Sequence, residues 1–115
     1  CLEIDDWLCE DNGGTFLVTV DDGRIIGTGA IRWLEEGVCE LKRMWLLTEY
    51  HGQGLGYRMM QELFKSARER GYKVMRLETD RAVQTRAVNF YRKLGFYEIP
   101  RFGDDPDDMG MEMAL

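Results

Sequence analysis

The chain has 115 residues, of which 44% are hydrophobic and 31% are charged, so it is long enough for one domain with a real core and too apolar for a disordered chain. Its formal net charge of −6 argues against a nucleic-acid partner, which favours a basic face, and is compatible with an amine-bearing substrate. Its longest uninterrupted apolar run, Met44–Leu47, is far shorter than the roughly 20 residues that a membrane span needs.

The first half of the sequence predicts an antiparallel meander. Its segments are rich in β-branched and aromatic residues and are separated by acidic-glycine turn signals. A helix end, closed by Asn12-Gly13-Gly14, is expected before the meander. In chain order, we predict the helix end at Leu2–Cys9 and strands at Thr15–Val20, Arg24–Trp33 and Val38–Leu47.

In the second half the hydrophobic period becomes helical. Leu55, Met59, Leu63 and Ala67 form one apolar stripe, and Gly71 provides the stop. A strand, a second helix and a last strand follow, at Tyr72–Thr79, Ala82–Leu94 and Met109–Leu115. Because a strand, a crossover helix and a strand place two strands in parallel, we predict a mixed α/β fold with one parallel pair in an otherwise antiparallel sheet.

A cluster of three glycines joins the Val38–Leu47 strand to the first helix. Gly52, Gly54 and Gly56 allow a phosphate to approach free backbone N–H groups at the positive end of the helix dipole. The spacing is not that of a dinucleotide fingerprint or a Walker loop, because Tyr57 stands where the last glycine or the lysine is required. The cluster therefore predicts a site for a different phosphorylated cofactor.

Four segments, taken in order, resemble the GCN5-related N-acetyltransferase (GNAT) superfamily. The loop is similar to that family's Gln/Arg-x-x-Gly-x-Gly/Ala pattern, with His51 in the first position, and the similarity covers roughly Gly14 to Leu115. The resemblance implies a single GNAT-type acyl-CoA N-acyltransferase domain over residues 1–115 that lacks the first strand and most of the two helices after it. The four segments are 40–46, 51–56, 76–79 and 87–96.

The same resemblance implies acetyl-CoA as the cofactor. Backbone groups of the glycine loop would hold its pyrophosphate, and the preceding strand would pair with its pantetheine arm if the two parallel strands splay apart. Gln84 stands where many family members have an asparagine that contacts this arm, and Asn89 lies one helical turn further on. The expected cofactor-binding residues are Met44, Trp45, Leu46, His51, Gly52, Gln53, Gly54, Leu55, Gly56, Gln84 and Asn89.

Two residues are candidates for catalysis. The family resemblance places Tyr91 near the cofactor sulfur, where a phenol of pKa about 10 can protonate a thiolate whose conjugate acid has a pKa of about 8.5. Glu40 is the candidate base that deprotonates an incoming amine, and Glu78 is a weaker one. A chain of water molecules without a dedicated base is the alternative.

These residues predict an N-acetyltransferase that moves an acetyl group from acetyl-CoA to a small-molecule or peptide primary amine by direct attack in a ternary complex. The alternative is a non-catalytic acyl-CoA-binding or interaction module of the same fold. Three cysteines and one histidine are too few for a structural zinc site or a disulfide framework, so we expect no metal and a cytoplasmic location. No membrane association is expected, and a homodimer is one of the open oligomeric states.

Overall fold

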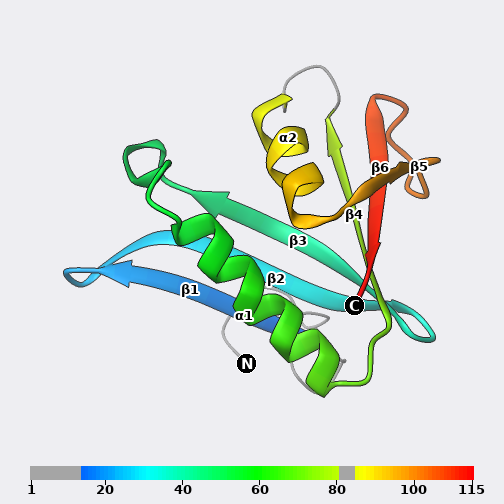
Figure 1. Cartoon of the computed structure of the whole chain (residues 1–115), viewed down its shortest axis with the longest axis horizontal. Helices are drawn as coiled ribbons and strands as arrows, with labels where there is room; N and C mark the ends of the chain where they lie inside the picture. Colours follow the sequence, from blue (N-terminus) through cyan, green and yellow to red (C-terminus); the bar gives the residue numbers. More distant parts are fainter. Residues whose placement is uncertain (1–13, 81–84) are drawn as a thin grey trace.

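The computed structural model describes residues 14–80 and 85–115 and contains one mixed six-stranded sheet with strand order β1-β2-β3-β4-β6-β5. Two helices lie on one face of this sheet (Figure 1), which we call the helix face. The elements are β1 (Thr15–Asp21), β2 (Arg24–Glu35), β3 (Val38–Leu46), a 3-10 helix (Thr48–Tyr50), α1 (Leu55–Glu69), β4 (Val74–Asp80), α2 (Thr85–Leu94), β5 (Tyr97–Ile99) and β6 (Asp108–Ala114).

The antiparallel meander is confirmed. β1 pairs with β2 and β2 pairs with β3, both antiparallel, through the tight turns that the acidic-glycine signals predicted. Asp22 and Gly23 have φ values of 50° and 78°, and Gly37 has a φ of 77°, which explains why these turns contain glycine.

The parallel pair is confirmed as well, and it is short. β3 and β4 are in register only at Val38/Val74, Cys39/Met75 and Glu40/Arg76. Beyond these pairs the two strands continue without pairing to each other, while β4 pairs with β6 along its whole length. The middle of the sheet therefore opens between β3 and β4.

The core lies between the sheet and the two helices. α1 buries Met59, Leu63 and Ala67 of the predicted stripe, and α2 contributes Val88 and Tyr91. An aromatic cluster connects the helices to the chain after α2, with ring centroids 6.3 Å apart for Phe64 and Phe96 and 5.6 Å apart for Tyr91 and Phe96. These contacts fix the position of α2 beside the opening of the sheet.

The sequence did not predict the 3-10 helix or the short strand β5. The predicted helix end at 2–9 and the first residues of the second predicted helix, 82–84, lie outside the described residues. None of the helices within residues 14–80 and 85–115 is both long enough and apolar enough to cross a lipid bilayer.

Candidate functional site

A β-bulge in β3 lies at the opening of the sheet. Thr28 of β2 is opposite Trp45, and Ala30 is opposite Lys42, so β3 contains one more residue than β2 between these pairs. Arg43 takes up the extra residue with a φ of 56°, a left-handed conformation that costs a non-glycine residue roughly 1–2 kcal/mol. The Thr28 hydroxyl donates a hydrogen bond of 2.7 Å to the Arg43 carbonyl and holds the bulge in place. A bulge bends its strand, and this one lies where β3 has parted from β4.

A cleft of about 330 Å³ lies between the separated strands. Residues 41–44 of β3 and 77–80 of β4 form its walls, and Ala87 and Tyr91 of α2 close one side. The register with β4 ends at Glu40, so the β4 side of the later part of β3 has no strand partner within the described part of the chain. The splay that pantetheine pairing would require is therefore present.

The glycine loop leaves room for an anion at the start of α1. Gly54 is the N-cap residue of α1, with a φ of 81° and no side-chain cap, and Gly52 has a φ of 80°. A Cβ atom added at either glycine would meet nothing within 4 Å. Since the first N–H groups of a helix have no partner inside the helix, this uncapped end is suited to a phosphate group.

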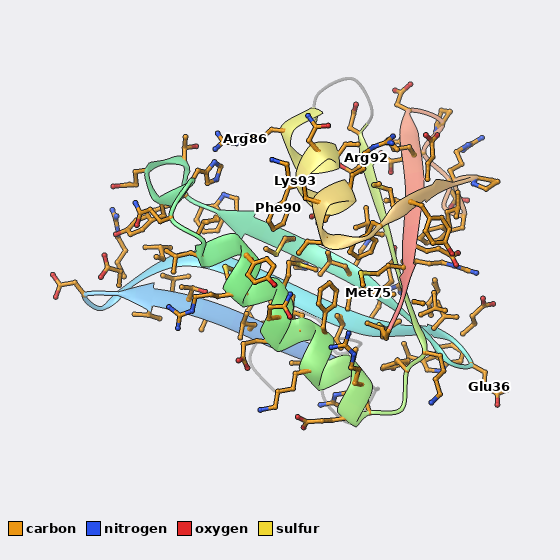
Figure 2. All side chains as sticks on the ribbon, viewed as in Figure 1. Glu36, Met75, Arg86, Phe90, Arg92 and Lys93 are labelled. Atoms are coloured by element: carbon orange, nitrogen blue, oxygen red, sulfur yellow. The ribbon has the colours of Figure 1, made fainter. Side chains whose placement is uncertain are left out.

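Gly56 has a different role from the other two glycines. A Cβ atom there would lie 3.3 Å from Cζ of Phe90, so the missing side chain lets α1 approach α2 closely. Figure 2 shows Phe90 on the side of α2 that faces α1. Gly56 thus sets the distance between the start of α1 and the helix that carries Tyr91.

The His51 side chain folds back toward the end of β3. Its Nε2 donates a hydrogen bond of 2.8 Å to the Leu46 carbonyl, and its Nδ1 is buried without a partner among the described residues. The Gln53 amide donates to the Glu49 carbonyl at 3.4 Å, which agrees with a backbone rather than a side-chain role for Gln53. Contact of the His51 side chain, and of the Gln53 backbone, with phosphate stays a prediction.

The predicted strand residues point in different directions. Met44 packs against the core, whereas the Trp45 side chain is 47% exposed. If both residues contact a cofactor, they would therefore do so through their backbone N–H and C=O groups. On α2, Asn89 is exposed and does not line the cleft, and Gln84 lies outside the described residues.

Tyr91 lines the cleft and is only 8% exposed. Its ring contacts Phe90 and Phe96, and its hydroxyl has no hydrogen-bond partner within residues 14–80 and 85–115. Burial raises the pKa of Tyr91 to about 12, so the phenol keeps its proton near neutral pH. A protonated phenol on a residue that lines the cleft is able to donate a hydrogen bond to a bound molecule.

Glu40 does not line the cleft. Its neighbours Cys39 and Leu41 belong to the core on the helix face, so Glu40 points to the opposite face of the sheet. There its Oε1 accepts a hydrogen bond of 2.8 Å from Arg32, and its Oε2 lies 3.8 Å from Nζ of Lys42. Glu78, the weaker candidate, accepts hydrogen bonds from the backbone N–H groups of Phe102 and Gly103 at 3.0 and 2.9 Å.

The structure also brings Asp108, which the sequence places in the acidic loop 104–108, together with Asp80, which the sequence reasoning missed. Asp80 at the end of β4 and Asp108 at the start of β6 are register partners, and both line the cleft. The sequence showed an acidic run around Asp108 but not the antiparallel pairing that places it beside Asp80.

Comparison with known proteins agrees with this geometry. The model of the Acetyltransferase (GNAT) family matches residues 2–96. The chain is 36% identical over 104 residues to the IAA acetyltransferase of Azospirillum brasilense, covering 87% of this chain and 67% of that one. It is 34% identical over 90 residues to the uncharacterized N-acetyltransferase YjgM of Escherichia coli, covering 76% of this chain and 53% of that one.

A solved structure shows the same fold. PaiA N-acetyltransferase from Thermoplasma acidophilum, in complex with coenzyme A, has a TM-score of 0.79 and 26% identity, covering 89% of this chain and 61% of that one. This chain spans about half the length of YjgM and two thirds of the Azospirillum protein. The family model covers most of the sequence, from residue 2 to residue 96, so the chain belongs to the GNAT acetyltransferase family.

Proposed function

We propose that this chain transfers an acetyl group from acetyl-CoA to a primary amine by direct attack in a ternary complex. The observation that carries the proposal is the uncapped start of α1, where Gly54 has a φ of 81° and open space in place of a side chain. Backbone N–H groups from Gln53 to Gly56 would hold the pyrophosphate there. The relatives named as acetyltransferases and the coenzyme A complex of PaiA support the choice of cofactor.

The cleft would bind the rest of acetyl-CoA and the amine. The unpaired side of β3 offers backbone donors and acceptors to the amide groups of the pantetheine arm. Acetyl-CoA, when bound, supplies an activated thioester. A β3 backbone N–H would polarise the thioester carbonyl, and the cleft walls would position the amine against it.

Tyr91 would supply the proton that the departing sulfur needs. The ammonium form of the amine would first lose one proton to bulk water. As the new N–C bond formed and the C–S bond broke, the nitrogen would give up a second proton and the sulfur would gain one from the Tyr91 hydroxyl. The lost amine proton returns to the phenol through water, so the phenol is restored. The Arg32 contact with Glu40 favours such a water chain over direct deprotonation by Glu40.

The second candidate function is a non-catalytic acyl-CoA-binding module. It is favoured by the engagement of Glu40 with Arg32 and of Glu78 with the backbone at Phe102 and Gly103. Such a module would bind acetyl-CoA and release no coenzyme A when amines are added.

The test changes Gly54 to valine and uses Gly37→Val as its matched control. Both glycines have left-handed φ values, 81° and 77°, and neither has an atom within 4 Å of an added Cβ, so both variants carry a similar backbone strain of roughly 1–2 kcal/mol. Only Gly54→Val places methyl groups where the phosphate would lie. We expect the Kd for acetyl-CoA, measured by calorimetry, to rise at least about 100-fold in Gly54→Val and to be unchanged in Gly37→Val.

Release of coenzyme A in the presence of a panel of primary amines then separates the two functions. Turnover supports the transferase, and tight acetyl-CoA binding without turnover on any amine supports the binding module. Equal affinities of the two glycine variants would remove the loop from cofactor binding.

A further inference from the structure

The shape of the glycine loop depends on contacts with neighbouring segments. Gly52 and Gly54 have left-handed φ values of 80° and 81°, and a Cβ atom added at either would meet nothing within 4 Å. Glycine has little conformational preference of its own at such positions. A phosphate site made of backbone N–H groups needs these groups to point at one place, and any rearrangement on binding lowers the affinity. The contacts that hold the chain just before the loop are therefore informative.

The chain just before the loop forms the 3-10 helix Thr48–Tyr50, which leads through His51 into the glycines. The Tyr50 N–H donates to the Leu47 carbonyl at 2.9 Å, and the His51 N–H donates to the Thr48 carbonyl at 3.0 Å. A single 3-10 turn has poor hydrogen-bond geometry, and none of the residues of this helix is buried. Its position therefore depends on side-chain contacts with other elements.

Two of these contacts come from the tip of the β1–β2 hairpin. The Tyr50 hydroxyl donates a hydrogen bond to Oδ2 of Asp21, the last residue of β1. Nη2 of Arg24, the first residue of β2, lies 3.4 Å from Oε1 of Glu49. The hairpin tip and the 3-10 helix lie at the same end of the molecule (Figure 1). Contacts between residues 29 and 25 positions apart in the sequence thus join the hairpin to the chain that enters the glycine loop.

The tyrosine contact is the stronger of the two. A phenol that donates to a carboxylate forms a charge-assisted hydrogen bond. This bond to Asp21 raises the pKa of Tyr50, so the phenol keeps its proton at neutral pH. The side chains of Arg24 and Glu49 are 57% and 63% exposed, so their ion pair contributes little by itself. Because neither contact is buried, its loss should hardly change the stability of the whole fold.

Backbone groups of two other strands hold the same segment. Nε2 of His51 donates a hydrogen bond of 2.8 Å to the Leu46 carbonyl at the end of β3. The Leu47 N–H donates to the Ile26 carbonyl of β2, also at 2.8 Å. These bonds fix the chain where it leaves β3, and the Tyr50 side chain adds the link to β1.

We propose that Tyr50 is a positioning residue for the coenzyme site. Through Asp21 it connects the β1–β2 hairpin to the 3-10 helix and so holds the glycine loop in the conformation that accepts the pyrophosphate. This inference rests on the proposed function, which puts the pyrophosphate at Gly54. In this role Tyr50 needs no contact with the coenzyme, because its hydroxyl is engaged by Asp21 and it acts through the backbone that follows it.

The test is Tyr50→Phe, with Tyr97→Phe as its matched control. Tyr97 lies on β5, at the opposite edge of the sheet from β1, and donates an equivalent hydrogen bond of 3.0 Å to Glu112. Each variant removes one exposed phenol–carboxylate bond and keeps the ring. We expect the Kd for coenzyme A, measured by calorimetry, to rise roughly three- to tenfold in Tyr50→Phe, since only a fraction of the free chains would then have the binding conformation. Tyr97→Phe should bind coenzyme A like the unchanged chain, and the two variants should unfold within about 2 °C of each other.

Variants of Asp21 separate positioning from a general loss of structure. Asp21→Asn and Asp21→Ala remove the same charge, but only the first keeps an oxygen that accepts from Tyr50. We expect Asp21→Asn to bind coenzyme A nearly as tightly as the unchanged chain, and Asp21→Ala to bind it as weakly as Tyr50→Phe. The double variant Tyr50→Phe/Asp21→Ala should be no weaker than either single variant, because both remove the same contact. Additive losses, or an Asp21→Asn variant as weak as Asp21→Ala, would overturn the proposal.

Gly54→Val distinguishes failure of this inference from failure of the proposed function. If Gly54→Val loses coenzyme A binding while Tyr50→Phe and Tyr97→Phe bind it equally, only this inference fails. If the unchanged chain binds no coenzyme A, or Gly54→Val binds it equally well, the proposed function fails and this inference fails with it.

Discussion

Tyr91 combines two properties that core tyrosines rarely need. Its ring belongs to the aromatic cluster with Phe90 and Phe96, so its position is fixed by packing. Its hydroxyl nevertheless lines the cleft without a partner among the described residues, and burial raises the pKa to about 12. The phenol therefore keeps its proton near neutral pH.

Replacing Tyr91 with phenylalanine removes the hydroxyl and keeps the ring. We expect kcat to fall about 100-fold, at the low end for general acid catalysis because a thiolate is already a fair leaving group. The KM for acetyl-CoA should change little. Tyr72→Phe is the control, since Tyr72 is a buried tyrosine outside the cleft. Unchanged turnover of Tyr91→Phe at every pH from 6 to about 10 would remove Tyr91 from the mechanism.

At the scale of the strands, a row of side chains with alternating charge crosses the sheet opposite the helix face. Register pairs connect Arg32, Glu40, Arg76, Glu112 and Tyr97 on five neighbouring strands. Arg76 Nε donates to Glu112 at 3.3 Å, and the Tyr97 hydroxyl donates to Glu112 at 3.0 Å. Glu40/Arg76 is the last pair before β3 and β4 part, so we infer that the row helps to fix where the cleft begins.

Glu40→Gln distinguishes a structural carboxylate from a catalytic one. Glu40 is 3% exposed and contacts Arg32 at 2.8 Å, so loss of its charge should lower the free energy of unfolding by about 1–3 kcal/mol, less than for a fully buried pair because Arg32 reaches solvent. We expect kcat of the folded protein to stay within a few-fold. Thermal unfolding and steady-state kinetics on the same preparation check both values.

Glu35→Gln is the control for this variant. Glu35 contacts Arg76 at 3.1 Å, but its side chain is 57% exposed, so its loss should hardly change stability. A Glu40→Gln variant of unchanged stability that loses kcat more than about 100-fold would instead make Glu40 the base.

Much of the element order was predictable, because it depends on local patterns. The hydrophobic period that predicts α1 and the acidic-glycine signals that predict the turns around Gly23 and Gly37 each depend on residues close together in the sequence. The bulge at Arg43 was not predictable, since arginine carries no signal for a left-handed backbone and the Thr28 contact joins residues on different strands. The strand β5 was missed because its three residues gain their partners only from β6.

Some residues of the candidate site were also predictable from local sequence, and others were not. Gly54 and Tyr91 belong to short motifs, so the sequence indicated them directly. The ion pair of Glu40 with Arg32 and the meeting of Asp80 with Asp108 depend on strand register, which a single sequence does not reveal.

At the scale of the whole molecule, few register pairs join the two halves of the sheet across its middle. β3 and β4 share three register pairs, whereas β4 and β6 share seven. The cleft lies at this seam, and its walls come from both sides of it. A ligand in the cleft that also reaches the start of α1 would therefore connect the two parts and bind only the folded chain.

This arrangement predicts a large effect of acetyl-CoA on thermal unfolding. At a concentration 100 times its Kd, a ligand that binds only the folded state adds about 2.7 kcal/mol, which in a domain of this size raises the midpoint by roughly 10 °C. Coenzyme A should give a similar shift, because the pyrophosphate and pantetheine contacts do not need the acetyl group, and ATP should give little. Differential scanning fluorimetry measures all three ligands on one preparation. A folded sample whose midpoint does not move with either coenzyme would mean that the glycine loop serves only as a turn, or that this chain needs further residues to complete the site.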